Sequence, residues 1–152
     1  MECVAQPGIL APVSRVGRYL FFTLTPEPRP LADALLRFVP LVDGVAVVAG
    51  LGLACVAAVG AVVPGLREFP DLAGAKVAIP STPTALWCWL RGEDMGDLVH
   101  RTRQIEQVLA PALRLEGVVD GFRYGQGPNG HGRDLTGYED GTENPHDEAA
   151  VL

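Results

Sequence analysis

The stretch TALWCWLRGEDMGDLVHRTRQIEQVLAPALRLEGVVDGFRY, residues 84–124, alternates strand-like and helix-like patterns. Its central part, residues 95–109, carries apolar residues three and four positions apart, which predicts an amphipathic helix. The flanking parts, residues 84–90 and 112–124, are rich in aromatic and β-branched residues, which is typical of strands. Because side chains alternate along a strand, we expect Trp87 and Trp89 on one face of the first strand.

The preceding part of the chain shows the same alternation. Residues 1–16 are interrupted by proline and glycine and predict an irregular lead-in. Residues 17–25 predict a strand, residues 31–39 a short helix and residues 45–49 a second strand. This order predicts an α+β fold, a ferredoxin-like sandwich of the dimeric α/β barrel type, with an antiparallel sheet and helices on one face. We expect residues 1–152 to form this single domain.

The run from Gly44 to Leu66 carries no charged residue and is 23 residues long. That length is sufficient to span a bilayer, so a small membrane-associated protein is one alternative. The run is nevertheless built largely from alanine, valine and glycine, and it lacks flanking aromatic belts and basic clusters. We therefore favour a buried strand, a glycine-rich turn and a buried helical segment, and expect no membrane partner.

Composition limits the classes of partner and compartment. The formal net charge is −6, which argues against nucleic-acid binding because that requires a basic surface. Cys3, Cys55 and Cys88 are far apart in the sequence and form no metal-binding or disulfide pattern, which favours buried thiols in a reducing compartment. The first residues show no secretion signal. We therefore expect a cytoplasmic protein.

A turn-rich segment, residues 132–145, reads Gly-Arg-Asp-Leu-Thr-Gly-Tyr-Glu-Asp-Gly-Thr-Glu-Asn-Pro. Asp-Gly and Asn-Pro pairs favour turns, and Gly137 and Gly141 would let the backbone approach a large flat ligand. Asp140 lies between these glycines and could point into a cavity. A solvated surface turn is the simple alternative, and the spacing does not fit a calcium-binding EF-hand loop.

The whole segment resembles the signature of the dye-decolourising (Dyp-type) haem peroxidases, roughly R-D-L-[ST]-G-[FY]-x-D-G-T-E-N-P. The resemblance extends to residues 6–10, 66–70 and 121–123 in the same order, and it favours the bacterial cytoplasmic branch. It implies an enzyme, an oxidoreductase that reduces hydrogen peroxide while oxidising dyes, phenolic compounds or other small electron donors through an iron-containing haem b.

The resemblance also implies roles for particular residues. Asp140 matches the distal aspartate, which would move a proton from the inner to the outer oxygen of peroxide as general acid–base. Gly137 and Gly141 match the motif glycines and are assigned to backbone approach to the haem. The three positions after them, Thr142, Glu143 and Asn144, are expected near the haem edge.

In this family the metal-binding histidine and the distal arginine lie in a second ferredoxin-like domain, so we expect the chain to correspond to the N-terminal half. No metal ligand is expected within it, since His100, His131 and His146 do not match the ligand position. We expect either a homo-oligomer or dependence on a missing half. The alternative function is a truncated, non-catalytic ferredoxin-like binding or assembly module.

Overall fold

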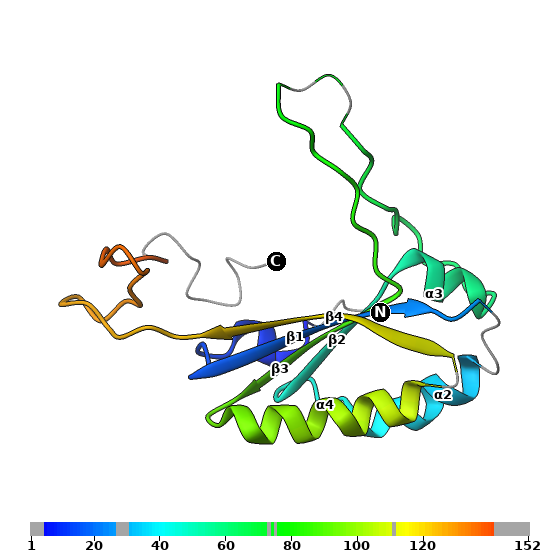
Figure 1. Cartoon of the computed structure of the whole chain (residues 1–152), viewed down its shortest axis with the longest axis horizontal. Helices are drawn as coiled ribbons and strands as arrows, with labels where there is room; N and C mark the ends of the chain where they lie inside the picture. The colour runs from blue at the N-terminus through cyan, green and yellow to red at the C-terminus, as the bar shows by residue number, and fades with distance from the viewer. Residues whose placement is uncertain (1–4, 27–30, 73, 75, 111, 142–152) are drawn as a thin grey trace. The chain divides into compact units, whose positions relative to one another are not determined.

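Four strands of the computed structural model form one sheet in the order β2-β3-β1-β4 (Figure 1). Their bounds are β1 (Val16–Leu24), β2 (Val47–Leu51), β3 (Leu86–Gly92) and β4 (Leu113–Phe122). The pairs β1–β3 and β2–β3 are antiparallel, and β3 therefore lies between β1 and β2. The structure describes residues 5–26, 31–72, 74, 76–110 and 112–141, which fall into two units, residues 1–121 and 122–152.

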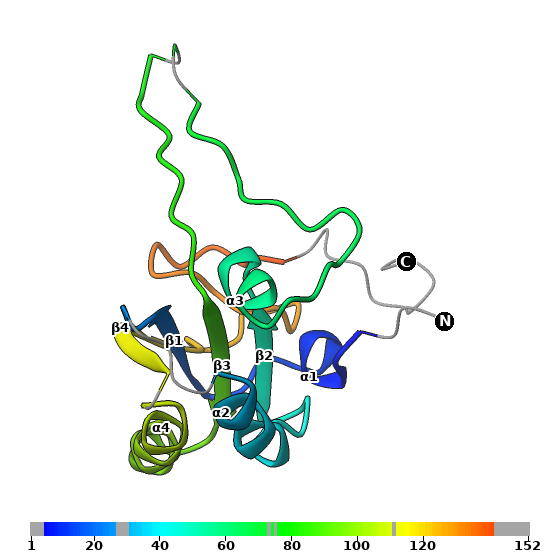
Figure 2. The same cartoon turned by 90° about the vertical axis from the view of Figure 1, so that its right-hand side faces the viewer.

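The two longest helices lie on the same side of this sheet (Figure 2). They are α2 (Leu31–Phe38), which continues into the short 3-10 helix η1 (Val39–Leu41), and α4 (Met95–Leu109). Helix α4 packs on β1 and β3, and α2 packs on α4. The antiparallel sheet with helices confirms the predicted α+β, ferredoxin-like fold.

The core lies between the sheet and these helices. Alternate residues of β3, namely Leu86, Cys88 and Leu90, are fully buried there, as are Ile105 and Leu109 of α4. Burying side chains of this size contributes roughly 1.5–3 kcal/mol each. The helical spacing and the strand alternation seen in the sequence thus correspond to the two sides of one core.

The opposite face of the sheet carries Tyr19, Trp87 and Trp89. The ring of Tyr19 stacks on Trp87 and Trp89, with centroid separations of 6.0 and 5.9 Å, which confirms that the two tryptophans share a face. Glycines on neighbouring strands leave room for these rings. A Cβ on Gly17 would lie 3.0 Å from Nε1 of Trp89, and one on Gly121 would lie 3.6 Å from the Tyr19 ring.

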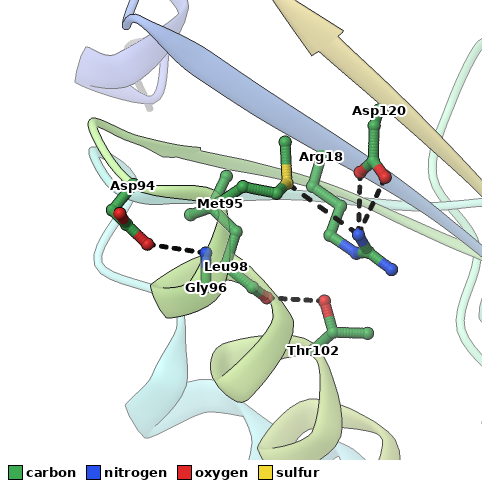
Figure 3. A network of polar contacts seen from close by, with 7 residues as sticks. All are labelled: Arg18, Asp94, Met95, Gly96, Leu98, Thr102 and Asp120. Carbon is green, nitrogen blue, oxygen red and sulfur yellow. Dashed lines mark hydrogen bonds and ion pairs between the residues drawn. The ribbon is translucent and has the colours of Figure 1, made fainter.

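Helix α4 begins at a side-chain cap that Figure 3 shows together with its surroundings. Asp94 has an extended backbone, and its Oδ1 accepts hydrogen bonds from the N–H groups of Gly96 (2.7 Å) and Asp97 (3.3 Å). On the sheet beside the helix, Arg18 donates to both carboxylate oxygens of Asp120 at 2.8 and 2.9 Å. This ion pair links β1 to β4.

The lead-in differs from the expectation, because Pro7–Leu10 form a short helix, α1. Beside it, the Gln6 carboxamide accepts a hydrogen bond from the N–H of Ala49 (3.0 Å) and donates one to its carbonyl (2.7 Å). The side chain of Gln6 therefore mimics a neighbouring strand along β2. Blocking a sheet edge in this way opposes pairing with other chains.

The uncharged run forms β2 and, after Gly52, a short helix, α3 (Leu53–Ala58), in the order expected. The prediction that the helical segment is buried was wrong, because only Cys55 and Val56 of α3 are buried and residues 57–65 are exposed. Among the described residues, no helix has both the length and the apolar character needed to cross a membrane.

Candidate functional site

The signature segment lies in the second unit, where the chain folds back on itself. Two isolated bridges, Gln126↔Gly132 and Arg133↔Glu139, hold successive parts of the segment side by side. The N–H of Arg133 donates to the carbonyl of Gly125 at 3.0 Å, and that of Gly127 to the carbonyl of His131 at 2.9 Å. The result is a loop that folds back on itself twice, with residues 134–141 in its last part.

A tight turn opens the signature at Asp134. Its Oδ1 accepts hydrogen bonds from the backbone N–H (2.8 Å) and the hydroxyl (2.5 Å) of Thr136, and its carbonyl accepts the N–H of Gly137 (3.1 Å). The hydroxyl bond from Thr136, with backbone donors, lowers the pKa of Asp134. Gly137 has φ +96°, a left-handed conformation that favours glycine, so the turn explains this residue of the motif.

Asp140 is exposed and follows the second bridge. Its N–H donates to the carbonyl of Gly132 at 2.8 Å, and its Oδ1 accepts the N–H of Gly141 at 2.7 Å. Gly141 has φ +77°, so a left-handed glycine again turns the chain directly after the carboxylate. The structure thus brings Gly137, Asp140 and Gly141 together on one loop, with the carboxylate available to a ligand.

Two supports of this loop were not anticipated from the sequence. Glu139 accepts hydrogen bonds from the backbone N–H (2.7 Å) and the side-chain amide (3.0 Å) of Asn129. The guanidinium of Arg133 lies over the ring of Tyr124, 5.1 Å from its centroid. The sequence signal that could have indicated these contacts is the glycine-rich run before the motif. A Cβ on Gly127 would overlap the Glu139 side chain, and one on Gly125 would lie 3.1 Å from the Arg133 guanidinium.

The remaining predicted site residues lie outside the part of the chain that the structure describes. Thr142, Glu143 and Asn144 lie outside the described residues, as does His146. Within the described ranges, no group of three or more histidine, cysteine, aspartate or glutamate side chains could hold a metal ion. His100 is exposed on α4, and His131 is half-buried in the second unit.

The motif residues fit an approach by a large flat group such as haem. A Cβ built on Gly137 would meet no heavy atom within 4 Å, so the turn has open space on that side. Glycine turns with open space permit close backbone contact with a planar ring. The exposed carboxylate of Asp140 follows on the same loop and could reach a small molecule bound beside such a ring.

Another segment of the expected resemblance, residues 66–70, lies in the first unit. Its residues Leu66 to Phe69 line an open cleft of about 280 Å³ together with residues 52–53 and 80–84. Phe69 remains 58% exposed. The cleft is small for a drug-sized ligand, for which pockets of roughly 300–1,000 Å³ are usual.

Comparison with known proteins places these features in a family context. No family model matches the chain. A dye-decolorizing peroxidase of Brevibacterium linens is 37% identical over 87 residues, which cover 57% of this chain and 22% of that protein. One from Rhodococcus erythropolis is 29% identical over 165 residues, covering 100% of this chain and 46% of that protein.

Solved structures give the same result. DyPB from Rhodococcus jostii aligns with a TM-score of 0.75 and 25% identity, over 95% of this chain and 49% of the other. The encapsulated DyP-type peroxidase from Mycobacterium smegmatis aligns with a TM-score of 0.74 and 24% identity, over 94% and 48%. The expected resemblance to the dye-decolourising peroxidases is confirmed, and the matched part spans 22% of the Brevibacterium linens protein and 46% of the Rhodococcus erythropolis protein.

Proposed function

We propose that this chain contributes the distal, acid–base part of a haem peroxidase that reduces hydrogen peroxide and oxidises dyes or phenolic donors. The observation that carries the proposal is the exposed carboxylate of Asp140, held on a loop between two left-handed glycines. The relatedness to dye-decolourising peroxidases supports the reaction class. One structural neighbour, a DypB variant from Rhodococcus jostii, was solved in complex with heme.

When bound, haem b would supply the iron that binds peroxide and accepts its oxidising equivalents. Gly137 and Gly141 would allow the loop to approach the ring, and residues 142–144 would lie near its edge. The Asp140 carboxylate would take the proton from the inner oxygen of peroxide and return it to the outer oxygen. The departing group is then water, which is a better leaving group than hydroxide.

The proposal includes the surroundings of the site. We expect the iron ligand to come from outside this chain, either from a second half or from another subunit, so a homo-oligomer or a dependence on such a half forms part of the proposal. A cytoplasmic location is supported by the free, buried thiols of Cys55 and Cys88, which suit a reducing compartment. The electron donor is a small molecule.

The test is a haem titration of the purified chain, followed by absorbance, with a peroxide-dependent dye assay on the same samples. The titration is repeated with the missing half of a relative added in trans, where we expect a saturable Soret band and turnover. In that mixture Asp140→Ala should lower the rate about 100- to 10,000-fold, the usual contribution of a general acid–base. Asp97→Asn, an exposed carboxylate of α4, is the matched control and should retain the rate.

A Soret band with turnover that survives Asp140→Ala would refute the assigned role. Absence of both band and turnover in the mixture with the added half would refute the proposal and favour the non-catalytic binding or assembly module. Band and turnover in the chain alone would refute the expectation that the iron ligand comes from outside it.

A further inference from the structure

Glu139 forms a clasp across the base of the signature loop. Its Oε1 accepts the backbone N–H of Asn129 at 2.7 Å, and its Oε2 accepts the Nδ2–H of the same residue at 3.0 Å. Both carboxylate oxygens are thus used by a single residue ten positions earlier. Hydrogen bonds to a charged group are about twice as strong as those between neutral groups.

The glycine at position 127 is the counterpart of this clasp. A Cβ on Gly127 would overlap the carboxyl group and Cγ of Glu139. Gly127 is not among the positive-φ glycines of the described chain, so its backbone angle does not require glycine. The requirement is steric: any larger residue at position 127 would displace the Glu139 side chain from Asn129.

The clasp acts on the backbone directly next to the candidate acid–base residue. Glu139 is bridged to Arg133 on the neighbouring part of the loop, and the N–H of Asp140 donates to Gly132 at 2.8 Å. The backbone at 139–140 is therefore held by these bonds and, through the Glu139 side chain, by Asn129. Asp140 itself is exposed, and its Oδ1 accepts the N–H of Gly141.

We propose that Glu139 is a positioning residue, which with Gly127 and Asn129 holds Asp140 in the geometry its proton transfer requires. Its role in catalysis rests on the proposed function, whereas the clasp itself does not. A displacement of a catalytic group by about 1 Å can lower the reaction rate about 100-fold. Holding the backbone next to Asp140 in place would therefore protect the rate.

The first experiment measures amide hydrogen exchange at Asp140 by NMR in the full chain without haem. Glu139→Ala should raise the exchange rate about tenfold or more, because hydrogen bonds to a charged group are lost. Glu139→Gln, which keeps one acceptor oxygen, should restore most of the protection. Glu116→Ala, which removes an exposed carboxylate paired with Arg114 in the first unit, is the matched control and should leave the rate unchanged.

The second experiment is a double-mutant cycle with Gly127→Ala. In the native background this substitution should raise the Asp140 exchange rate about tenfold, because the methyl group expels Glu139. In the Glu139→Ala background it should change the rate by about twofold or less, since the clash is gone. The unfolding midpoint reported by Trp87 and Trp89 should stay the same in all four proteins.

Equal effects of Gly127→Ala in both backgrounds would overturn the clasp, as would an unchanged exchange rate in Glu139→Ala. In protein that binds haem, Glu139→Ala should lower the peroxide-dependent rate while leaving the donor KM unchanged, with recovery in Glu139→Gln. Loosened exchange with an unaltered rate would overturn the positioning role. Absence of haem binding even with the missing half of a relative added, in contrast, counts against the proposed function and leaves the exchange result standing.

Discussion

Removing the cap of α4 gives a prediction whose size follows from the structure. Asp94→Ala deletes the Oδ1 that accepts the N–H groups of Gly96 and Asp97, at 2.7 and 3.3 Å. The first bond is strong and the second is long, so we expect a mid-range capping loss of about 1 kcal/mol. For a chain of this length, that loss lowers the unfolding temperature by about 2–4 °C.

Comparison variants separate the hydrogen bond from the charge. Asp94→Asn keeps an acceptor oxygen but removes the negative charge from the positive end of the helix, and should cost about 0.3–0.5 kcal/mol. Asp97→Ala removes a charge in the same turn without removing the cap, and should cost a similar small amount. Urea unfolding followed by the fluorescence of Trp87 and Trp89 measures all three free energies.

Either of two results would refute the reasoning. If Asp94→Ala and Asp97→Ala destabilise the protein equally, the two hydrogen bonds at Asp94 contribute nothing beyond the helix dipole. If Asp94→Asn is as damaging as Asp94→Ala, charge alone accounts for the effect.

Three further predictions concern the first unit. The ion pair joins Arg18, whose side chain is 16% exposed, to Asp120, whose side chain is 48% exposed. Asp120→Asn should lower the free energy of unfolding in urea by about 0.5–1 kcal/mol. Adding Arg18→Met to this variant should give no further loss. Burial raises the pKa of Asp43, but the N–H groups of residues 47, 45 and 46 outweigh it and hold the pKa below its usual range. The stabilisation is therefore present above the unfolded pKa of about 3.9 and is lost as pH falls through the lower folded pKa, so Asp43→Asn should flatten the decline of the unfolding midpoint below pH 4. Burial raises the pKa of Cys88 to about 12, so this thiol should resist alkylation at pH 8 until the protein is unfolded, which mass spectrometry of labelled peptides would show.

Local pattern was sufficient for most of the secondary structure. The apolar stripe within residues 95–109 predicted a helix, and these residues form α4, because an apolar stripe at helical spacing can be buried in only one way. The prediction of an irregular lead-in was wrong at residues 7–10, where Pro7 begins a single helical turn. Four residues are too few to display a period.

The candidate site was predictable to a different extent. The sequence predicted a turn-rich loop with Asp140 between Gly137 and Gly141, whereas the left-handed backbone of both glycines was found in the structure. The clasp of Glu139 on Asn129 was missed, because neither residue type nor spacing reveals a chain reversal. The roles of Thr142, Glu143 and Asn144 stay predictions, since these residues lie outside the described part of the chain.

By itself, the sequence determined the periodic elements, the fold class and the resemblance to the dye-decolourising peroxidases, because these depend on residues close together in the chain. Only the tertiary structure decided which distant residues meet. Tyr19 lies between Trp87 and Trp89, Gln6 covers the backbone of Ala49, and the strand order is β2-β3-β1-β4. Such contacts depend on how whole elements pack, since burial of apolar area is non-directional and many pairings satisfy the same local pattern.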